Sequence, residues 1–361
     1  MKSKTKRKAI TKKIPSAREE RVLTKYLGYE AFRPKVVGCI NKYLSLSENQ
    51  SLTVGIYCGG ERFVFGNDAE CESHYYDVGS ISKTMTAHLC LKIAEERSID
   101  LNRSVSDFID LPRGNYPSLY QLLSHTAGYG HLTPAEITVP SLLRHGYARR
   151  NIYEGCTAES VVKSLSRRRN ITPRGYSYSD FPLAVIAVAL ERITCEPFAT
   201  LIEDFVQNDL GMKSTVISLP EHLRYPKSAL GKRTVGFWRW ERDNPYVAGG
   251  GLVSTVGDML NYIAVQVESD EPYIRGAHRL CRESVSERSD VVTCIGWHSY
   301  KKSNQLWHVG GVGTFRSSII INRPRKIGVV VLGNSKGKAS ANVHYLAKML
   351  YSEMKIKKIN F

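Results

Sequence analysis

Segments with strand character stand near both ends of this chain, and a long middle part has the pattern of helices and loops. The early segment, "SLTVGIYCGGERFVFG" (51–66), contains two β-rich runs joined by Gly59-Gly60 and predicts a hairpin. The later runs, all after about residue 245, are "VVTCIGWHSY", "NQLWHV", "TFRSSIIIN" and "KIGVVVLGN". This order predicts a sheet whose first strands are separated from the others by a helical insertion, with a pocket at the seam.

Helical periodicity is strongest over 81–97 and 181–194, and the second segment, "FPLAVIAVALERIT", is apolar almost all round. A helix without a polar face is expected to be buried. Further helices are expected within 18–48, one of them starting near Pro34, and an amphipathic helix is expected over 340–356.

The length of 361 residues allows one large domain or two moderate ones. With 42% hydrophobic and 24% charged residues, the composition is that of a globular protein. We expect a basic disordered tail over 1–16, a sheet domain formed by 17–79 together with 241–361, and a mainly helical domain over 80–240.

The tail begins MKSKTKRKAITKK, which holds seven basic side chains and no acid and supplies a large share of the formal charge of +17. Such an arm could contact nucleic acid, anionic lipid or an acidic partner, but a solvated tail is the simpler interpretation. No module typical of nucleic-acid binding accompanies it. No apolar signal segment follows it, and no window approaches the ~20 apolar residues that span a bilayer. The sequence therefore predicts a cytoplasmic protein without a membrane span.

Eight cysteines are scattered without a CxxC pair, which argues against a zinc ribbon or a redox dithiol and favours buried free thiols. The sequence contains no G-x-S-x-G elbow, no Walker loop and no H-E-x-x-H, so it implies no metal and no other cofactor. We interpret His125 as a structural residue and the basic run at 167–169 as a solvated surface.

A candidate nucleophile stands at the start of the helix expected over 81–97. Ser80 follows Gly79, which allows a tight entry, and Lys83 lies one helical turn later on the same face. A serine hydroxyl becomes nucleophilic when a neighbour removes its proton, and a partly desolvated lysine amine can do so. Alone, the S-x-x-K pattern more often means a capping serine with a solvated lysine.

A second candidate element lies in the turn before the helix expected over 181–194, where Tyr178 and Asp180 stand two residues apart. A lysine ammonium nearby would lower the pKa of Tyr178, which could then act as a base toward Ser80 and as an acid toward a leaving group. A core tyrosine beside a helix-capping aspartate is the alternative.

A third candidate element is "LWHVGGVGTFRSSIIIN", in which Gly310-Gly311 would let a substrate approach a strand closely. The amides of Gly311 and Ser80 could form a two-donor oxyanion hole, with His308 beside it. Taken alone, the segment is a glycine-rich turn with a strand histidine.

Together and in this order, the segments Ser80 to Lys83, Tyr178 to Asp180 and His308 to Gly310 resemble the motifs of the serine β-lactamase and penicillin-binding-protein-like superfamily, in its class C and esterase-like branch. Three further stretches resemble the same family: "LLSHTAGYG", "DLGM" and "VAGGGLVSTVGDMLNY". The resemblance implies an α/β (α+β) fold in which an antiparallel sheet flanked by helices is joined to an all-α insertion domain.

The resemblance also implies roles for the candidate residues. Ser80 would be acylated, Lys83 would activate it, and Tyr178 would shuttle the proton. His308 occupies the position where relatives carry Lys or His, and the Gly311 amide would complete the oxyanion hole.

Two departures from the family pattern stand near the expected site. Relatives usually carry Asn where this chain has Asp180, and a carboxylate cannot donate a hydrogen bond to a substrate carbonyl. It would instead favour the charged form of Lys83 and oppose a tyrosinate. Thr314 and Arg316 replace residues that are often small, and Arg316 could clamp a substrate carboxylate, with a solvated strand residue as the alternative.

The favoured function is a serine hydrolase that forms an acyl-enzyme on an amide or ester, in a peptide, a β-lactam-like compound or a small ester. A cytoplasmic location favours an intracellular peptidase, amidase or esterase over an enzyme acting on antibiotics or cell wall. An acyltransferase or peptide cyclase would use the same acyl-enzyme, because water exclusion decides the outcome. A catalytically impaired scaffold that binds peptides or another partner also stays open, and Asp180 is the one feature in its favour.

Overall fold

The computed structural model describes residues 34–44, 51–66, 71–131, 134–145, 151–172, 175–219, 238–279, 289–334 and 342–356. The predictions for the basic tail and for a helix within 18–33 lie outside these residues.

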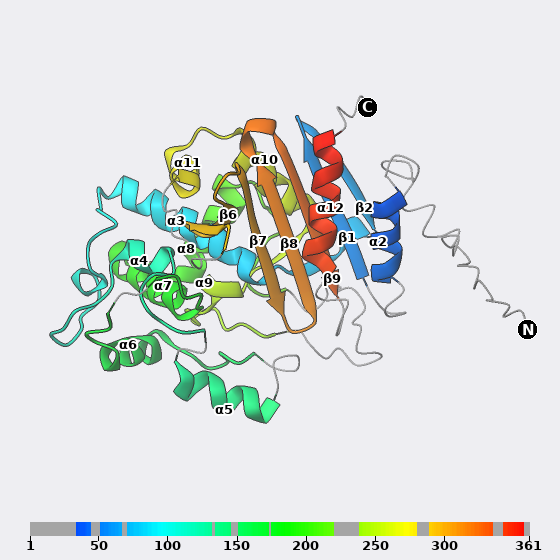
Figure 1. Ribbon diagram of the computed structural model, residues 1–361. Coiled ribbons are helices and arrows are strands. Elements are labelled where there is room, and N and C mark those ends of the chain that lie inside the picture. The colour runs from blue at the N-terminus through cyan, green and yellow to red at the C-terminus, as the bar shows by residue number, and fades with distance from the viewer. Residues whose placement is uncertain are drawn as a thin grey trace, which may run out of the picture.

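The centre of the fold is a seven-stranded antiparallel sheet with the strand order β2-β1-β9-β8-β7-β6-β5 (Figure 1). The hairpin predicted over 51–66 is present, since β1 pairs with β2 in a register that ends at Cys58 and Glu61. Strand β1 also pairs with β9, which joins the early and late strands in one sheet as predicted. The strands are β1 (Ser51–Cys58), β2 (Glu61–Gly66), β5 (Val291–Cys294), β6 (Trp297–Tyr300), β7 (Gln305–Val312), β8 (Phe315–Asn322) and β9 (Ile327–Asn334).

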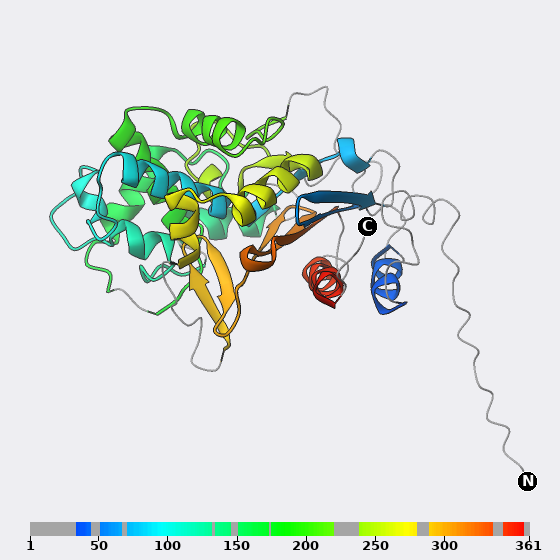
Figure 2. The same ribbon diagram turned by 90° about the horizontal axis from the view of Figure 1, so that it is seen from above.

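Different helices cover the two faces of the sheet. Helices α2 (Pro34–Leu44) and α12 (Asn342–Ile356) lie side by side on one face, and α10 (Val256–Glu268) lies on the other (Figure 2). In β9, Val329 and Val331 pack into the core under α12, whereas Val330 and Leu332 face the main core. Because successive side chains of a strand point to opposite faces, this continuous apolar run contributes side chains to both cores. The predicted helices at Pro34 and over 340–356 are confirmed.

The middle of the chain is helical, as predicted, and α7 (Phe181–Thr194) lies at its centre with every side chain from 181 to 190 buried. Helices packed around α7 are α3 (Ser82–Glu96), α4 (Leu119–Leu123), α6 (Ala158–Arg167), α8 (Phe198–Asp204) and α9 (Val247–Gly250). The peripheral helices are α5 (Ala135–His145) and α11 (Pro272–Arg279), and the short ones are η2 (Cys71–Ser73), η3 (Gly79–Ile81), η4 (Val105–Asp107), η5 (Phe205–Asp209) and η6 (Arg323–Arg325). A two-stranded sheet pairs β3 (Tyr75–Asp77) with β4 (Val253–Thr255).

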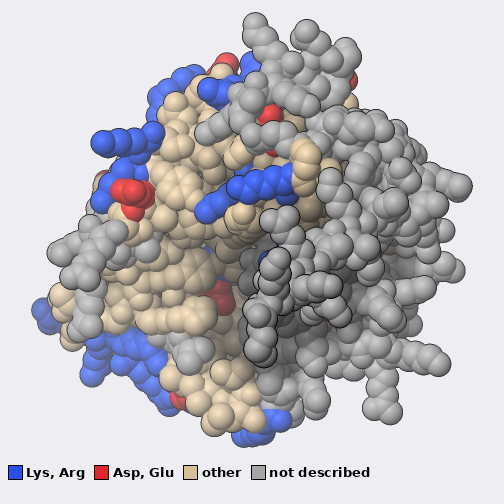
Figure 3. Space-filling model, turned by 45° about the vertical axis from the view of Figure 1, so that its right-hand side comes forward, with Lys and Arg blue, Asp and Glu red and all other residues tan. Residues whose placement is uncertain are grey.

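On the described part of the face drawn in Figure 3, lysine and arginine side chains lie mainly along the edges. None of the helices in the described part of the chain combines the length and the apolarity needed to cross a membrane.

Two sequence predictions about individual side chains need correction. The cysteines at 71, 90, 156 and 294 are buried thiols outside any disulfide between described residues, as predicted, but Cys195 is exposed and Cys39 and Cys58 are partly exposed. Cys195 ends α7 with a φ of 62°, a turn that reaches the surface. Within 167–169, Arg168 is not simply solvated, because its two terminal nitrogens donate to both carboxylate oxygens of Glu136 at 2.9 and 2.6 Å.

Strand β3 carries a buried carboxyl group without a partner. The Asp77 side chain is 1% exposed, and neither carboxylate oxygen makes a hydrogen bond in the described structure. Desolvation by burial raises the pKa of Asp77 well above its ordinary value. The fold therefore favours the neutral acid, and an ionised Asp77 costs stability.

Replacing Asp77 by asparagine is expected to stabilise the protein at neutral and alkaline pH. A group whose folded-state pKa is raised contributes stability below its unfolded pKa, and that contribution is lost as the pH rises through the folded pKa. Asparagine does not titrate, so Asp77→Asn should melt at a higher temperature than wild type at pH 8, by roughly 1–2 °C per kcal/mol gained in a chain of 361 residues. Thermal unfolding followed by circular dichroism at pH 4 and pH 8 measures this. A melting temperature no higher than that of wild type at pH 8 would contradict it.

Candidate active site

The loop that carries Ser80 leaves β3 and turns through η3 into α3. Gly79 has a φ of +55°, a conformation that strongly favours glycine. This confirms the prediction that Gly79 allows a tight turn into the helix. A Cβ atom on Gly79 would lie 2.6 Å from the backbone nitrogen of Gly311. The bare glycine therefore lets the loop that carries Ser80 lie directly beside strand β7.

Hydrogen bonds hold this loop from two sides. The Val78 carbonyl accepts a bond from Ser317 Oγ of β8 at 2.7 Å, and the Val78 amide donates to the Leu252 carbonyl at 3.0 Å. The Leu252 amide in turn donates to Ser82 Oγ at 3.3 Å. Ser80 thus sits on a backbone fixed to the sheet and to the segment before β4.

The protein's own packing requires a glycine at position 310, and the approach of a substrate predicted for Gly310 stays a prediction. A Cβ atom on Gly310 would lie 2.0 Å from the Val78 carbonyl oxygen and 2.3 Å from Ser317 Oγ. The close neighbours are therefore the loop that carries Ser80 and the side chain of Ser317. At Gly311, by contrast, the nearest neighbour of an added Cβ would be the Arg316 side chain at 3.5 Å, an ordinary contact.

Gly310→Ala and Gly311→Ala form a matched pair for testing this packing. Overpacking a close contact costs about 1–3 kcal/mol or more, so Gly310→Ala is expected to lower the melting temperature and to displace Ser80. Gly311→Ala is expected to melt close to wild type. Differential scanning calorimetry of both proteins compares them, and a Gly310→Ala protein as stable as Gly311→Ala would refute the packing argument.

Lys83 is fully buried beneath Ser80, and its ammonium group meets three acceptors. Its Nζ donates to Ser80 Oγ at 2.9 Å and to the Gly249 carbonyl at 2.5 Å, and it forms an ion pair with Asp180. Ser80 makes no capping bond at the helix start. The alternative of a capping serine with a solvated lysine is therefore wrong.

The Lys83–Asp180 pair determines the charge of the site. Burial by itself lowers the pKa of Lys83, but the Asp180 carboxylate and the Tyr178 phenol outweigh it, and the net shift is upward. Burial raises the pKa of Asp180, yet the Lys83 ammonium more than offsets this and holds it below its ordinary value. Lys83 is therefore charged and Asp180 ionised at neutral pH, as predicted for a carboxylate at this position.

Asp180 does not cap α7, although it stands at the N-cap position. Its Oδ2 accepts a hydrogen bond from the Tyr153 hydroxyl at 2.7 Å, while its Oδ1 faces Lys83. The side chain is 20% exposed. Its contacts orient Lys83, which argues against the predicted alternative of a capping aspartate.

The Tyr178 phenol lies within hydrogen-bonding reach of both Ser80 and Lys83, and Lys83 Nζ is 5.0 Å from the centre of its ring. The prediction of a lowered Tyr178 pKa is wrong. Burial raises the pKa of Tyr178, the Lys83 ammonium lowers it by a smaller amount, and the Asp180 charge raises it further.

The Tyr178 ring packs against the ring of His125 with centroids 4.7 Å apart, so His125 is a buried structural neighbour of the phenol.

His308 lines the same cavity as a neutral ring. Its Nδ1 lies 2.8 Å from the Val309 carbonyl and donates to it, so Nε2 carries the lone pair. Burial, with His298 and Lys83 nearby, holds the pKa of His308 well below its ordinary value. The site therefore lacks the second cation that a lysine at this position would supply.

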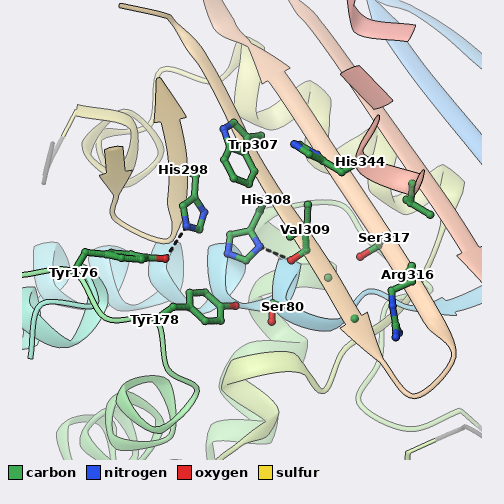
Figure 4. A pocket seen from close by; sticks show the side chains of 13 residues that line it. Ser80, Tyr176, Tyr178, His298, Trp307, His308, Val309, Arg316, Ser317 and His344 are labelled. Carbon is green, nitrogen blue, oxygen red and sulfur yellow. Dashed lines mark hydrogen bonds between the residues drawn. The ribbon is translucent and has the colours of Figure 1, made fainter. Parts of the chain in front are cut away.

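A cavity of about 520 Å³ opens over these groups. Ser80 and Tyr178 lie on one side of it, and Trp307 and His344 lie on the other (Figure 4). Arg316 also lines it, and its Nη1 donates to the carbonyls of Gly313 and Phe315 at 2.9 and 2.6 Å. A clamp on a substrate carboxylate by Arg316 stays a prediction.

The structure thus brings all the predicted site residues to one place, although they come from three distant segments. Sequence reasoning missed Tyr153, which holds Asp180, and the Gly249 carbonyl, which binds Lys83. Gly249 lies in the "VAGGG" stretch, whose resemblance to the family could have drawn attention to it, whereas nothing near Tyr153 marks it. No cluster of three or more potential metal ligands occurs among the described residues.

A sequence model of the beta-lactamase family matches residues 56–351. The chain belongs to the beta-lactamase family. A relative, protein flp of Staphylococcus aureus strain MW2, is 21% identical over 76% of this chain and 54% of its own length. Another, the D-alanyl-D-alanine-carboxypeptidase/endopeptidase AmpH of Escherichia coli K12, is 24% identical over 54% of this chain and 49% of its own length. The chain spans about half the length of these curated relatives.

Two solved structures share the fold. A penicillin-binding protein homologue from Pyrococcus abyssi, described as octameric, superposes with a TM-score of 0.68 at 20% identity, covering 89% of this chain and 77% of that one. A beta-lactamase/D-alanine carboxypeptidase from Pseudomonas syringae gives a TM-score of 0.69 at 15% identity, covering 89% and 97%. The predicted fold class is confirmed, and the domain boundaries stay a prediction.

Proposed function

We propose that this protein is a serine hydrolase that cleaves an amide or ester through an acyl-enzyme on Ser80. The observation that carries the proposal is the 2.9 Å contact between Lys83 Nζ and Ser80 Oγ in a cavity that also holds Tyr178. A hydroxyl, an amine and a phenol within reach of one another are the parts that nucleophilic catalysis requires.

In the proposed reaction, Ser80 Oγ attacks the carbonyl carbon while its proton passes to the Lys83–Tyr178 pair. The amides of Ser80 and Gly311, on adjoining backbones, would stabilise the oxyanion. Tyr178 would return the proton to the departing amine or alcohol, and water would later release the acyl group from Ser80. The pKa values of Lys83 and Tyr178 are both raised. Few molecules therefore carry a deprotonated Lys83 or Tyr178 at neutral pH, and the acylation rate should rise toward alkaline pH.

The charged Lys83 also supports a second candidate, a binding protein with impaired turnover. An ammonium ion held by Asp180 cannot accept the proton of Ser80, which would slow acylation or prevent it. The same groups would still bind a peptide or a small ester in the cavity.

Burst kinetics separate the two candidates. On mixing with p-nitrophenyl acetate at pH 8, the hydrolase should release one equivalent of p-nitrophenol rapidly and then turn over slowly, and Ser80→Ala should show neither phase. A wild type indistinguishable from Ser80→Ala would favour the binding protein. A chromogenic cephalosporin, a short ester and a peptide ending in D-alanine then compare three substrate classes, the last suggested by the name of the AmpH relative.

A further inference from the structure

The cavity above Ser80 extends to three adjacent aromatic rings that the reaction does not use. His298, Trp307 and His344 line it on the side away from Ser80 (Figure 4). The ring centroids of His298 and Trp307 are 4.7 Å apart with planes 20° from parallel. Those of Trp307 and His344 are 4.9 Å apart at 39°. We call these three residues the ring wall.

Hydrogen bonds fix the two imidazoles of the ring wall. His298 Nε2 shares a hydrogen bond of 2.8 Å with the Tyr176 hydroxyl, which also lines the cavity. His344 Nδ1 shares one of 2.9 Å with Ser318 Oγ of β8. A wall that is already ordered loses little conformational freedom when a ligand binds to it.

The ring wall is uncharged at neutral pH. Burial, with smaller contributions from His344 and Lys83, lowers the pKa of His298 to about 4, and burial, with a smaller contribution from Lys348, lowers that of His344 to about 4. None of the described residues lining the cavity is acidic, and Val309 and Val343 add apolar surface. This part of the cavity therefore disfavours a charged ligand group.

Three ring nitrogens of the wall have no hydrogen-bond partner among the described residues: His298 Nδ1, Trp307 Nε1 and His344 Nε2. Buried polar atoms normally find partners. All three atoms are buried, so they add no polar surface to the cavity.

We propose that the ring wall is a specificity pocket that binds a planar, uncharged aromatic group of the substrate near the carbonyl that Ser80 attacks. The catalytic part of this inference rests on the proposed function. Aromatic rings prefer to stack or to meet edge to face, which is worth roughly 2- to 10-fold in affinity beyond the area buried. A saturated ring of the same size gains the burial but not this preference.

Binding of two matched neutral amides to Ser80→Ala protein tests the pocket without any chemical step. Phenylacetamide is expected to bind at least about 3-fold more tightly than cyclohexylacetamide in NMR titrations. Adding Trp307→Ala should bring the ratio of affinities close to one, and adding Trp307→Phe, which restores a planar ring, should bring the preference back. Tyr345→Ala changes an exposed neighbour in α12 that does not line the cavity, so it should leave the ratio unchanged.

Equal affinity for the two amides, no detectable binding of either, or a preference that survives Trp307→Ala would overturn the pocket. The result of this binding test and the result of the burst experiment are independent of each other. Aromatic preference without a burst rejects the hydrolase and keeps the pocket, whereas a burst without aromatic preference rejects the pocket and keeps the hydrolase.

Discussion

Lys83→Met is expected to reduce the rate of Ser80 acylation by about 10²- to 10⁴-fold, the usual contribution of a positioned general base. Methionine has a similar length but offers no amine to take or pass on the Ser80 proton. The burst with p-nitrophenyl acetate measures the acylation rate directly. The substitution should also destabilise the protein by about 3–5 kcal/mol, because it leaves the Asp180 carboxylate without its buried ion-pair partner.

The double variant Lys83→Met/Asp180→Asn separates these two effects. Removing the orphaned charge should recover much of the lost stability in chemical denaturation, while acylation should stay slow. If the double variant regained acylation together with stability, Lys83 would be a structural residue and its assigned role in the reaction would be wrong.

Asp180→Asn is expected to accelerate acylation at pH 7 by roughly 10-fold for each unit by which the pKa of the proton acceptor falls. Asp180 raises the pKa values of both Lys83 and Tyr178, so its removal lowers both, whichever group accepts the proton. The acceptor is active when deprotonated, and the ascending limb of the pH profile should therefore move to lower pH. Asparagine also restores the amide that relatives usually carry at this position.

Tyr153→Phe is the matched control for Asp180→Asn. It removes the 2.7 Å hydrogen bond to Asp180 Oδ2 but keeps the carboxylate charge, so it should shift the ascending limb much less. The acylation rates of wild type and both variants are measured from pH 5 to pH 10. If the ascending limb of Asp180→Asn lay at the same pH as that of wild type, or if Asp180→Asn were slower than wild type at every pH, Asp180 would not restrain the reaction.

Much of the fold could be predicted because its signals are local. The apolar run of β9 and the all-round apolar α7 indicate burial on every side, and Gly59-Gly60 marks the hairpin. The strand order could not be predicted, since the pairing of β1 with β9 depends on contacts between residues far apart in the chain. Cys195 was misjudged for a related reason: residue type gives a preference for burial, not the place where a helix ends.

Within the site, nearness along one helix made the contact of Ser80 with Lys83 predictable from their spacing alone. The pKa of Tyr178 was predicted in the wrong direction because the effect of a neighbouring lysine is visible in a motif, whereas the depth of burial is not. Trp307 and His344 lie on different elements, and only the folded chain brings their rings into contact.

The nucleophilicity of Ser80 is tested most directly with a small fluorophosphonate, which phosphonylates an activated serine with loss of fluoride, followed by intact mass measurement and peptide mapping. The account predicts one adduct per wild-type chain, located on Ser80, and none on Ser80→Ala. An adduct on another residue, or no adduct on wild type at any pH at which the protein stays folded, would contradict it.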